Sequence, residues 1–269
     1  MSAVPFAMAG AGGRMGRQII SLAGRLPDQP VRLVGALESP GSALLGQDAH
    51  ILAGSGGSEV RISEDPTVAF AEARVIIDFT GPESTLRIAD YCAEHGKALV
   101  IGTTGLTEAE NASLREKSAK IPMLIAPNMS VGVNLLFHLV KKAAEVLSSG
   151  YDIEVVEAHH RHKKDAPSGT AVRLKDVLLE ALERSESDVR HGRHGIVGAR
   201  TDNEIGMHAL RGGDVVGDHT VSFMTDGERV ELTHRASSRD TFARGAISAA
   251  VFLDGKEPGL YTMDQVLGL

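Results

Sequence analysis

Short apolar runs alternate with amphipathic segments over the first half of the chain. The runs are nearly continuous in apolar residues, and they cover residues 4–9, 31–37, 73–79, 98–101 and 122–126. Such runs are typical of strands that are buried on both faces of a parallel sheet. Between these runs, the apolar residues of segments 84–95 and 107–120 have helical spacing. Strands that alternate with helices predict a parallel sheet with right-handed crossovers, whose ligands gather at the carboxyl ends of the strands.

The pattern changes in the second half. Helical spacing predicts three helices there, at residues 131–147, 171–182 and 241–253. Alternating polar and apolar positions predict a strand at 151–158, then two further runs, 208–211 together with 214–225 and afterwards 229–235. These runs predict a largely antiparallel or mixed sheet. The polar residues 185–204 predict a surface loop, and residues 259–269 a short tail.

A glycine-rich turn joins the first strand to the first helix. It consists of Gly10, Ala11, Gly12, Gly13, Arg14, Met15 and Gly16. In this setting, backbone N–H groups and the helix dipole bind the pyrophosphate of a dinucleotide. The strict G-x-G-x-x-G form fails, because Met15 stands at its last position. Glycine-rich turns are common, so this turn alone does not identify a cofactor.

Glu38 strengthens the cofactor hypothesis. It ends the second predicted strand, roughly 20 residues after the turn, where an acidic side chain binds the adenosine ribose. A carboxylate favours NAD(H), whereas the 2′-phosphate of NADP(H) requires a cation. The next residue is Ser39 rather than Arg or Lys.

A cationic segment follows the strand at 151–158. It contains His159, His160, Arg161, His162, Lys163 and Lys164. Pro167 prevents a helix from running through the segment, so the next helix begins after it, near Ser168, Gly169 and Thr170. Because the N-terminus of a helix also favours negative charge, we expect this segment to bind a small anion that carries carboxylate or phosphate.

Three alternatives compete with an anion site. The segment would also suit a solvated loop. Its histidines could bind a metal ion, but Arg161, Lys163 and Lys164 would repel a divalent cation, and we predict no metal. Nucleic acid is not expected as a partner, because the net charge is −7 and aromatic residues make up only 4% of the chain.

The bulk composition limits the cellular setting. The chain has 269 residues, enough for one large or two modest domains, and a single cysteine, Cys92. One cysteine excludes an intrachain disulfide framework and fits a reducing compartment. We find no apolar run of about 18–20 residues and no signal-peptide pattern. The expected location is the cytoplasm, with no membrane partner.

Together these segments resemble the 4-hydroxy-tetrahydrodipicolinate reductase (dihydrodipicolinate reductase) family of bacterial lysine and diaminopimelate biosynthesis. Residues 154–171, which read EVVEAHHRHKKDAPSGTA, carry most of the resemblance. Residues 10–16, 102–105, 128–134 and 234–239 support it. The resemblance therefore extends over nearly the whole chain.

The resemblance implies an α/β fold with two domains. The first, residues 1–129, would be a dinucleotide-binding domain with a Rossmann-type parallel sheet, to which residues 241–269 return. The second, residues 130–240, would be an α+β domain with a mixed sheet for substrate binding and oligomerisation. The family usually forms a homotetramer through the sheet of the second domain.

The resemblance also implies a reaction and its residues. Hydride passes from NAD(P)H to 4-hydroxy-tetrahydrodipicolinate, a small dianionic dicarboxylate, and tetrahydrodipicolinate forms. Lys163 would be the proton donor and His159 a second acid–base group, while His160, Ser168, Gly169 and Thr170 would bind the substrate. The implied cofactor contacts are Gly10, Ala11, Gly12, Gly13, Arg14, Met15, Glu38, Gly102, Thr103, Thr104, Ala126, Pro127, Asn128 and Met129. Ser39 leads us to predict NADH as the preferred cofactor, while Arg14 or Arg17 could still bind the 2′-phosphate of NADPH.

Two other hypotheses keep part of these features. Another nicotinamide-dependent reductase of small amino or imino acids would retain Gly10 and Glu38 without needing the motif from His159 to Thr170. A non-catalytic NAD(H)-binding sensor would be expected to lack the acid–base residues His159 and Lys163, which this chain contains.

Overall fold

The apolar runs of the first half form a parallel sheet. The computed structural model describes residues 3–23, 25–26 and 30–269, and in these residues the strand order of the sheet is β12-β6-β5-β4-β1-β2-β3. Its strands are β1 (Val4–Ala9), β2 (Val31–Leu37), β3 (Ile62–Ser63), β4 (Val75–Asp78), β5 (Ala98–Ile101), β6 (Pro122–Ile125) and β12 (Gly259–Tyr261). Every neighbouring pair is parallel. The predicted Rossmann-type sheet is confirmed.

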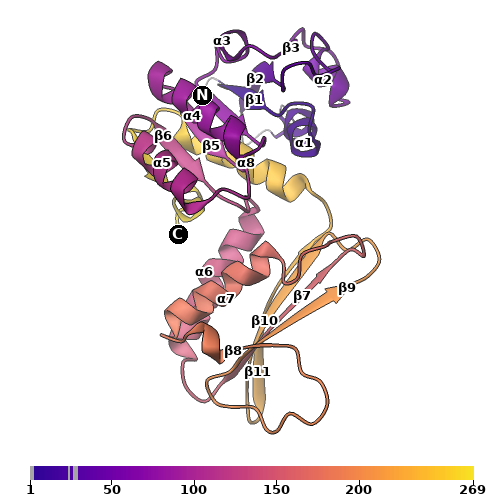
Figure 1. The fold of residues 1–269 in the computed structure, drawn as a ribbon, viewed down its shortest axis with the longest axis vertical. Helices are drawn as coiled ribbons and strands as arrows, with labels where there is room; N and C mark the ends of the chain where they lie inside the picture. Colours follow the sequence, from indigo (N-terminus) through magenta and orange to yellow (C-terminus); the bar gives the residue numbers. More distant parts are fainter. Residues whose placement is uncertain (1–2, 24, 27–29) are drawn as a thin grey trace. The chain divides into compact units, whose positions relative to one another are not determined.

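Helices cover both faces of this sheet (Figure 1). They are α1 (Arg14–Leu22), α2 (Ala49–Leu52), α3 (Pro66–Ala69), α4 (Pro82–His95), α5 (Glu108–Ser118), α8 (Asp240–Leu253) and α9 (Met263–Leu267). Because successive strand residues point to opposite faces, Phe6 and Met8 pack in one core cluster with Ile19 of α1 and Ile247 of α8. Ala7 and Ala9 of the same strand belong to a second core cluster on the other face.

The chain divides into two compact units. One comprises residues up to Val131 together with Arg239–Leu269, and the other comprises Gly132–Ser238. Helix α8 therefore belongs to the first unit, where it packs on α1 and on the central strands of the sheet.

The second unit is built on a mixed sheet, as predicted. Its order is β11-β10-β7-β9-β8, with β7 parallel to β9 and antiparallel to β10. The strands are β7 (Asp152–His159), β8 (Val189–His191), β9 (Ile205–Arg211), β10 (Gly217–Thr225) and β11 (Glu228–Ala236). The helices are α6 (Val131–Val146), α7 (Gly169–Ala181) and the short 3₁₀ helix η1 (Glu186–Asp188).

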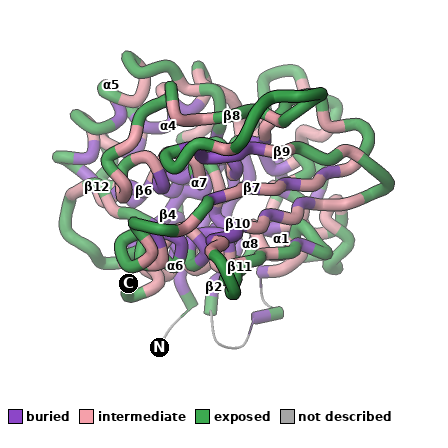
Figure 2. Tube along the Cα trace, turned by 90° about the horizontal axis from the view of Figure 1, so that it is seen from below, coloured by how far each residue is buried: buried purple, intermediate pink, exposed green. Residues whose placement is uncertain are grey.

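One face of this second sheet changes character along its length. Buried and less buried positions alternate along β7 and β10 (Figure 2). Ile153 and Val155 point into an apolar core shared with α6 and α7. By the same alternation, Glu157 and His159 lie on that inward face, and both are buried. The apolar core thus ends in titratable groups where β7 ends.

Two predictions for the second unit are wrong in part. Residues 185–204 are not only a loop, because they contain η1 and the edge strand β8, which pairs with β9. Residues 208–225 form two strands, not one interrupted run, and these strands, β9 and β10, lie on opposite sides of β7. Strand β8 has only three residues and no alternation, so only its pairing with β9 defines it.

The predicted tail is also more ordered than expected. Residues 259–261 form β12 beside β6, and α9 follows behind a capping box that Thr262 and Gln265 form. The short elements α2, α3 and β3 were not predicted. No helix among the described residues is both long enough and apolar enough to span a membrane.

Candidate active site

The glycine turn brings the backbone close to the start of α1. Gly10 has φ +79°, and a Cβ there would lie 2.7 Å from the carbonyl oxygen of Phe79. A Cβ on Gly16 would lie 2.1 Å from the carbonyl oxygen of Gly10, so α1 packs directly on the turn. Gly13 is the N-cap residue, and no side chain caps the helix. The first N–H groups of α1, from Arg14 and Met15, are therefore suitably placed for an anion.

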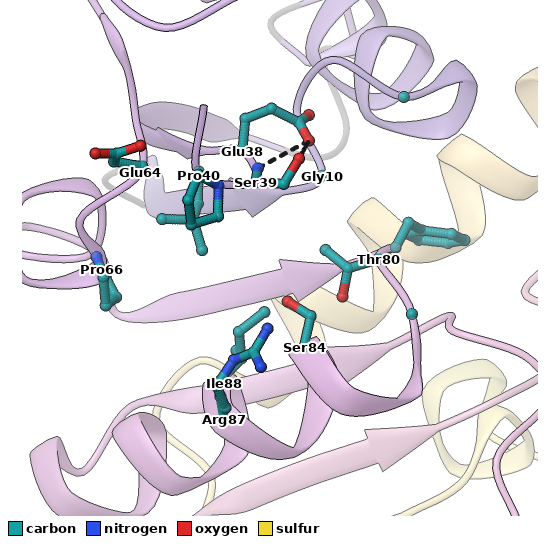
Figure 3. A pocket seen from close by; sticks show the side chains of 14 residues that line it. Gly10, Glu38, Ser39, Pro40, Glu64, Pro66, Thr80, Ser84, Arg87 and Ile88 are labelled. Carbon is teal, nitrogen blue, oxygen red and sulfur yellow. Dashed lines mark hydrogen bonds between the residues drawn. The ribbon is translucent and has the colours of Figure 1, made fainter. Parts of the chain in front are cut away.

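Glu38 lies over the same turn. Its Oε2 accepts a hydrogen bond from the N–H of Gly12 at 2.8 Å, and its Oε1 accepts from the N–H of Ser39 at 3.0 Å. Gly10, Gly13 and Glu38 line one cavity of about 660 Å³ (Figure 3), a volume in the ordinary range for ligand sites. The structure therefore brings the predicted pyrophosphate and ribose positions together.

These residues fit a nicotinamide dinucleotide. The turn offers N–H groups and close backbone approach to a pyrophosphate, and Glu38 offers a carboxylate to a ribose hydroxyl. Across the cavity lie Thr80, Ser84 and Arg87, the last two on α4 (Figure 3).

The predicted contacts at the nicotinamide end follow β5 and β6, and they do not line this cavity. Thr103 is buried, and its Oγ1 bonds Asp78 Oδ2 at 3.2 Å and Thr85 Oγ1 at 2.9 Å. Burial raises the pKa of Asp78. The hydroxyl of Thr103 thus joins the ends of β4 and β5.

The remaining cofactor positions follow β6, beside β5 in the sheet. Ala126 and Met129 are buried, whereas Pro127 is exposed. The side chain of Asn128 accepts a hydrogen bond from the N–H of Ser130 at 2.9 Å. This bond shapes the turn at the carboxyl edge of the sheet.

In the second unit, the carboxylate of Glu157 lies at the centre of the site. Its Oε2 lies 2.7 Å from Nδ1 of His159, and its Oε1 accepts from the N–H of Ser168 at 3.0 Å. Both oxygens also accept from the guanidinium of Arg211, at 2.8 and 2.7 Å. Burial raises the pKa of Glu157, but the hydrogen bonds from Arg211, His159 and Ser168 outweigh it, so the pKa lies below its usual range.

The start of α7 lies beside this carboxylate. Ser168 is the N-cap: its Oγ accepts from the N–H of Ala171 at 3.2 Å and also bonds Nε2 of His219 at 3.0 Å. The Ser168 side chain, predicted to bind substrate, is thus engaged in capping and in this second bond. Gly169 and Thr170 are the first residues of the helix, where its dipole favours negative charge.

Lys163 and His160 lie in the adjoining loop. Lys163 Nζ is 2.9 Å from Asp165 Oδ2, and Arg211 donates to the carbonyl oxygen of Asp165 at 2.7 Å. The loop is held by backbone bonds from His160 to Val215 at 2.7 Å and from Lys163 to His160 at 3.1 Å. Lys163 therefore connects through Asp165 and Arg211 to the group around His159.

The sequence did not identify Arg211 and His219 as parts of this site. Both come from other strands, and sheet register places them: His219 is opposite Glu157, and Arg211 is opposite His159. His219 stands at every second position of β10 together with the apolar residues Val221 and Phe223. This spacing is the signal in the sequence that places the histidine on the buried face of the strand. Residues 3–23, 25–26 and 30–269 contain no group of three or more His, Cys, Asp or Glu side chains arranged to hold a metal ion.

His219 makes the stability of the protein pH-dependent. Burial lowers the pKa of His219 to about 4, and the nearby His159 lowers it further, whereas the unfolded chain has an ordinary histidine pKa of about 6.5. Between these values the unfolded state binds the proton and the folded state does not, so stability falls as pH falls. We expect this group to cost about 2 kcal/mol between about pH 7 and pH 5. Urea unfolding at the two pH values measures the loss, which should be smaller by that amount in His219→Gln; equal losses would contradict the assignment.

Comparison with known proteins gives one family over nearly the whole chain. Residues 4–129 match the family of the dihydrodipicolinate reductase N-terminus, and residues 132–267 match that of its C-terminus. A 4-hydroxy-tetrahydrodipicolinate reductase of Anaeromyxobacter dehalogenans (strain 2CP-1) is 54% identical over 261 residues, which are 97% of this chain and 96% of that protein. The reductase of Syntrophotalea carbinolica is 50% identical and covers 99% of each chain.

A solved structure shows the same fold. The dipicolinate-bound dihydrodipicolinate reductase from Paenisporosarcina sp. TG-14 superposes with a TM-score of 0.74 at 22% identity, over 97% of each chain. Two matched family halves and relatives at about half identity confirm the resemblance that the motif predicts. The chain belongs to the dihydrodipicolinate reductase family.

Proposed function

We propose that the first unit binds the nicotinamide cofactor and that the second unit binds the dicarboxylate and supplies its protons, through Lys163 and His159. The chain is a 4-hydroxy-tetrahydrodipicolinate reductase, an oxidoreductase of the diaminopimelate and lysine pathway. The observation that carries the assignment of roles is the cluster in which His159, Glu157 and the start of α7 are joined by hydrogen bonds.

The chemistry requires a proton donor at the ring nitrogen. Loss of the 4-hydroxyl together with a proton from C5, as water, gives a conjugated imine, and a bound nicotinamide dinucleotide would supply a hydride to its C4. Hydride addition to a conjugated imine leaves electron density on the nitrogen, which a placed acid must neutralise. The ammonium of Lys163 gives this proton, and His159 serves as the second acid–base group.

The anionic ends of the substrate need fixed donors. Gly169 and Thr170 hold one carboxylate through the N–H groups at the start of α7 and the Thr170 hydroxyl. His160 contacts the other end. Ser168 contributes by capping the helix. A dicarboxylate is also bound in the solved Paenisporosarcina reductase, whose ligand is dipicolinate.

We further propose that NADH is preferred over NADPH. Glu38 lines the cavity together with Ser39, and no cation stands at that position. Glu64 lines the same cavity and accepts a hydrogen bond from the N–H of Gly41 at 3.0 Å. Two carboxylates near the ribose position would repel a 2′-phosphate. Arg87 also lines the cavity, but its guanidinium is paired with the carboxylate of Glu83.

One assay tests both the reaction and the preference. Substrate is generated in place from pyruvate and aspartate semialdehyde by the preceding synthase, and loss of reduced-nicotinamide absorbance is followed with each cofactor. We expect turnover with a kcat/KM at least tenfold higher for NADH, about 1.4 kcal/mol. Ser39→Arg should raise the value for NADPH about tenfold, with little change for NADH. A tenfold preference for NADPH in the native protein would contradict the cofactor proposal, and tight NADH binding without any turnover would contradict the roles of His159 and Lys163.

Assembly and location complete the proposal. A homotetramer formed through the sheet of the second unit agrees with Leu210, an apolar side chain on the outward face of that sheet that is 56% exposed. The single cysteine, buried in α4, agrees with a cytoplasmic enzyme.

A further inference from the structure

The Glu157 side chain takes part in four hydrogen bonds, although it does not lie in the substrate-binding loop. Its side chain is 1% exposed. Its donors come from three different places: His159 on the same strand, Arg211 on β9, and the backbone N–H of Ser168 at the start of α7. A single carboxylate therefore joins the acid–base histidine to the anion-binding end of a helix.

The bond to His159 determines which ring nitrogen faces outward. An ionised carboxylate only accepts hydrogen bonds, so His159 must donate from Nδ1, and Nε2 is left for other partners. Nε2 lies on the side of Gly217, 3.1 Å from the position that a Cβ on Gly217 would take. The neighbouring residue of β10 has no side chain there, so the edge of the ring that carries Nε2 has room.

We propose that Glu157 is a positioning residue for the reduction, whose carboxylate fixes the tautomer and direction of His159 and also holds the first turn of α7 in place for the substrate carboxylate. This inference rests on the proposed roles of His159, Gly169 and Thr170. Arg211 stabilises the carboxylate, because its guanidinium binds both oxygens side by side.

Glu157→Gln separates positioning from packing, since the amide has nearly the same shape. The amide offers one oxygen and one NH₂ group, so it cannot accept at both ends. The N–H of Ser168 can only donate, and it will take the oxygen. The NH₂ group then faces Nδ1 of His159 and Nη1 of Arg211. The guanidinium can only donate and loses this bond, whereas an imidazole can respond by moving its proton to Nε2. We expect His159 to change tautomer.

The experiment measures that tautomer together with the kinetics. Nitrogen NMR of the imidazole rings reports it, with the His159 signal assigned by its loss in His159→Gln. We expect native His159 to carry its proton on Nδ1 and the Glu157→Gln variant to carry it on Nε2. We expect kcat to fall about 100-fold, within the range of acid–base contributions, with a smaller change in KM and an unchanged Kd for NADH.

Glu154→Gln is the matched control. Glu154 lies on the same strand, on the opposite face, and its carboxylate binds Arg193 at 2.7 Å and His208 at 2.7 Å. It loses the same charge from a similar network, so we expect kcat and the His159 tautomer to stay as in the native protein. If Glu157→Gln does not fold, Glu157→Asp gives the same two readouts, because the shorter side chain cannot reach both His159 and Ser168.

The outcomes distinguish this inference from the function on which it rests. If His159→Gln leaves kcat unchanged, the proposed role of His159 fails, and the positioning role fails with it. If His159→Gln lowers kcat but Glu157→Gln keeps both kcat and the native tautomer, only the positioning role is overturned. Equal losses in Glu157→Gln and Glu154→Gln, with no tautomer change, would also overturn it.

Discussion

Lys163→Ala is expected to lower kcat by about 10³-fold, near the middle of the range for a lost general acid. The Lys163 side chain is 21% exposed, and its ammonium lies 2.9 Å from Asp165 Oδ2, so it is paired within the loop rather than freely solvated. Without it, water must protonate the substrate nitrogen in a site arranged for a placed donor. The Kd of NADH should not change, because the glycine turn and Glu38 belong to the other unit. Steady-state reduction kinetics and NADH fluorescence titration measure the two quantities.

Lys164→Ala controls for the loss of charge alone. Lys164 follows directly in the sequence and is exposed, so its removal should lower kcat no more than about threefold, as expected for a screened surface charge. Similar losses in both variants would show that the loop acts through its total charge. A Lys163→Ala variant that keeps a tenth of the native kcat or more would exclude Lys163 as the proton donor.

Gly16→Ala is expected to destabilise the first unit by about 3 kcal/mol, at the upper end for overpacking. The added Cβ would lie 2.1 Å from the carbonyl oxygen of Gly10 and 2.9 Å from Cα of Ala11. Both are backbone atoms of the turn, so α1 must move away from it. The melting temperature should fall by roughly 6–12 °C, and the Kd for NADH should rise at least tenfold, because the N–H groups of the turn move as well.

Gly57→Ala serves as the reference substitution. A Cβ there would lie 3.7 Å from Cδ1 of Ile51, which is ordinary contact distance, so stability and NADH binding should remain near native. Calorimetry and NADH titration of both variants provide the comparison. A Gly16→Ala protein as stable as Gly57→Ala would mean that the turn and α1 do not pack as closely as described.

The sequence predicts the first unit well because its strands are buried on both faces. The runs at 4–9 and 31–37 can be recognised as strands from their own residues, since each is almost wholly apolar. The edge strands β3, β8 and β12 have two or three residues each. Such strands exist because a longer neighbour offers free N–H and C=O groups, and that information is absent from their own residues.

The same distinction applies to the site. His159, Lys163 and Gly169 fall within one short segment, so a motif can reveal them together. Arg211 and His219 lie 54 and 51 residues from their hydrogen-bond partners. Their place depends on the register of β9 and β10 against β7, which a one-residue shift would reverse. Local pattern therefore reveals the residues proposed to react, and only the folded sheet reveals the side chains that are hydrogen-bonded around them.

The return of α8 to the first unit has a consequence for biosynthesis. A ribosome makes the chain from the N-terminus, so all of Gly132–Ser238 leaves it before Asp240–Leu253 does. The core around Met8 and Ile19 lacks Ile247 and Leu253 until then. The core of the first unit is therefore incomplete while the second unit is synthesised. The residues proposed to bind the substrate therefore exist before the core of the first unit is complete.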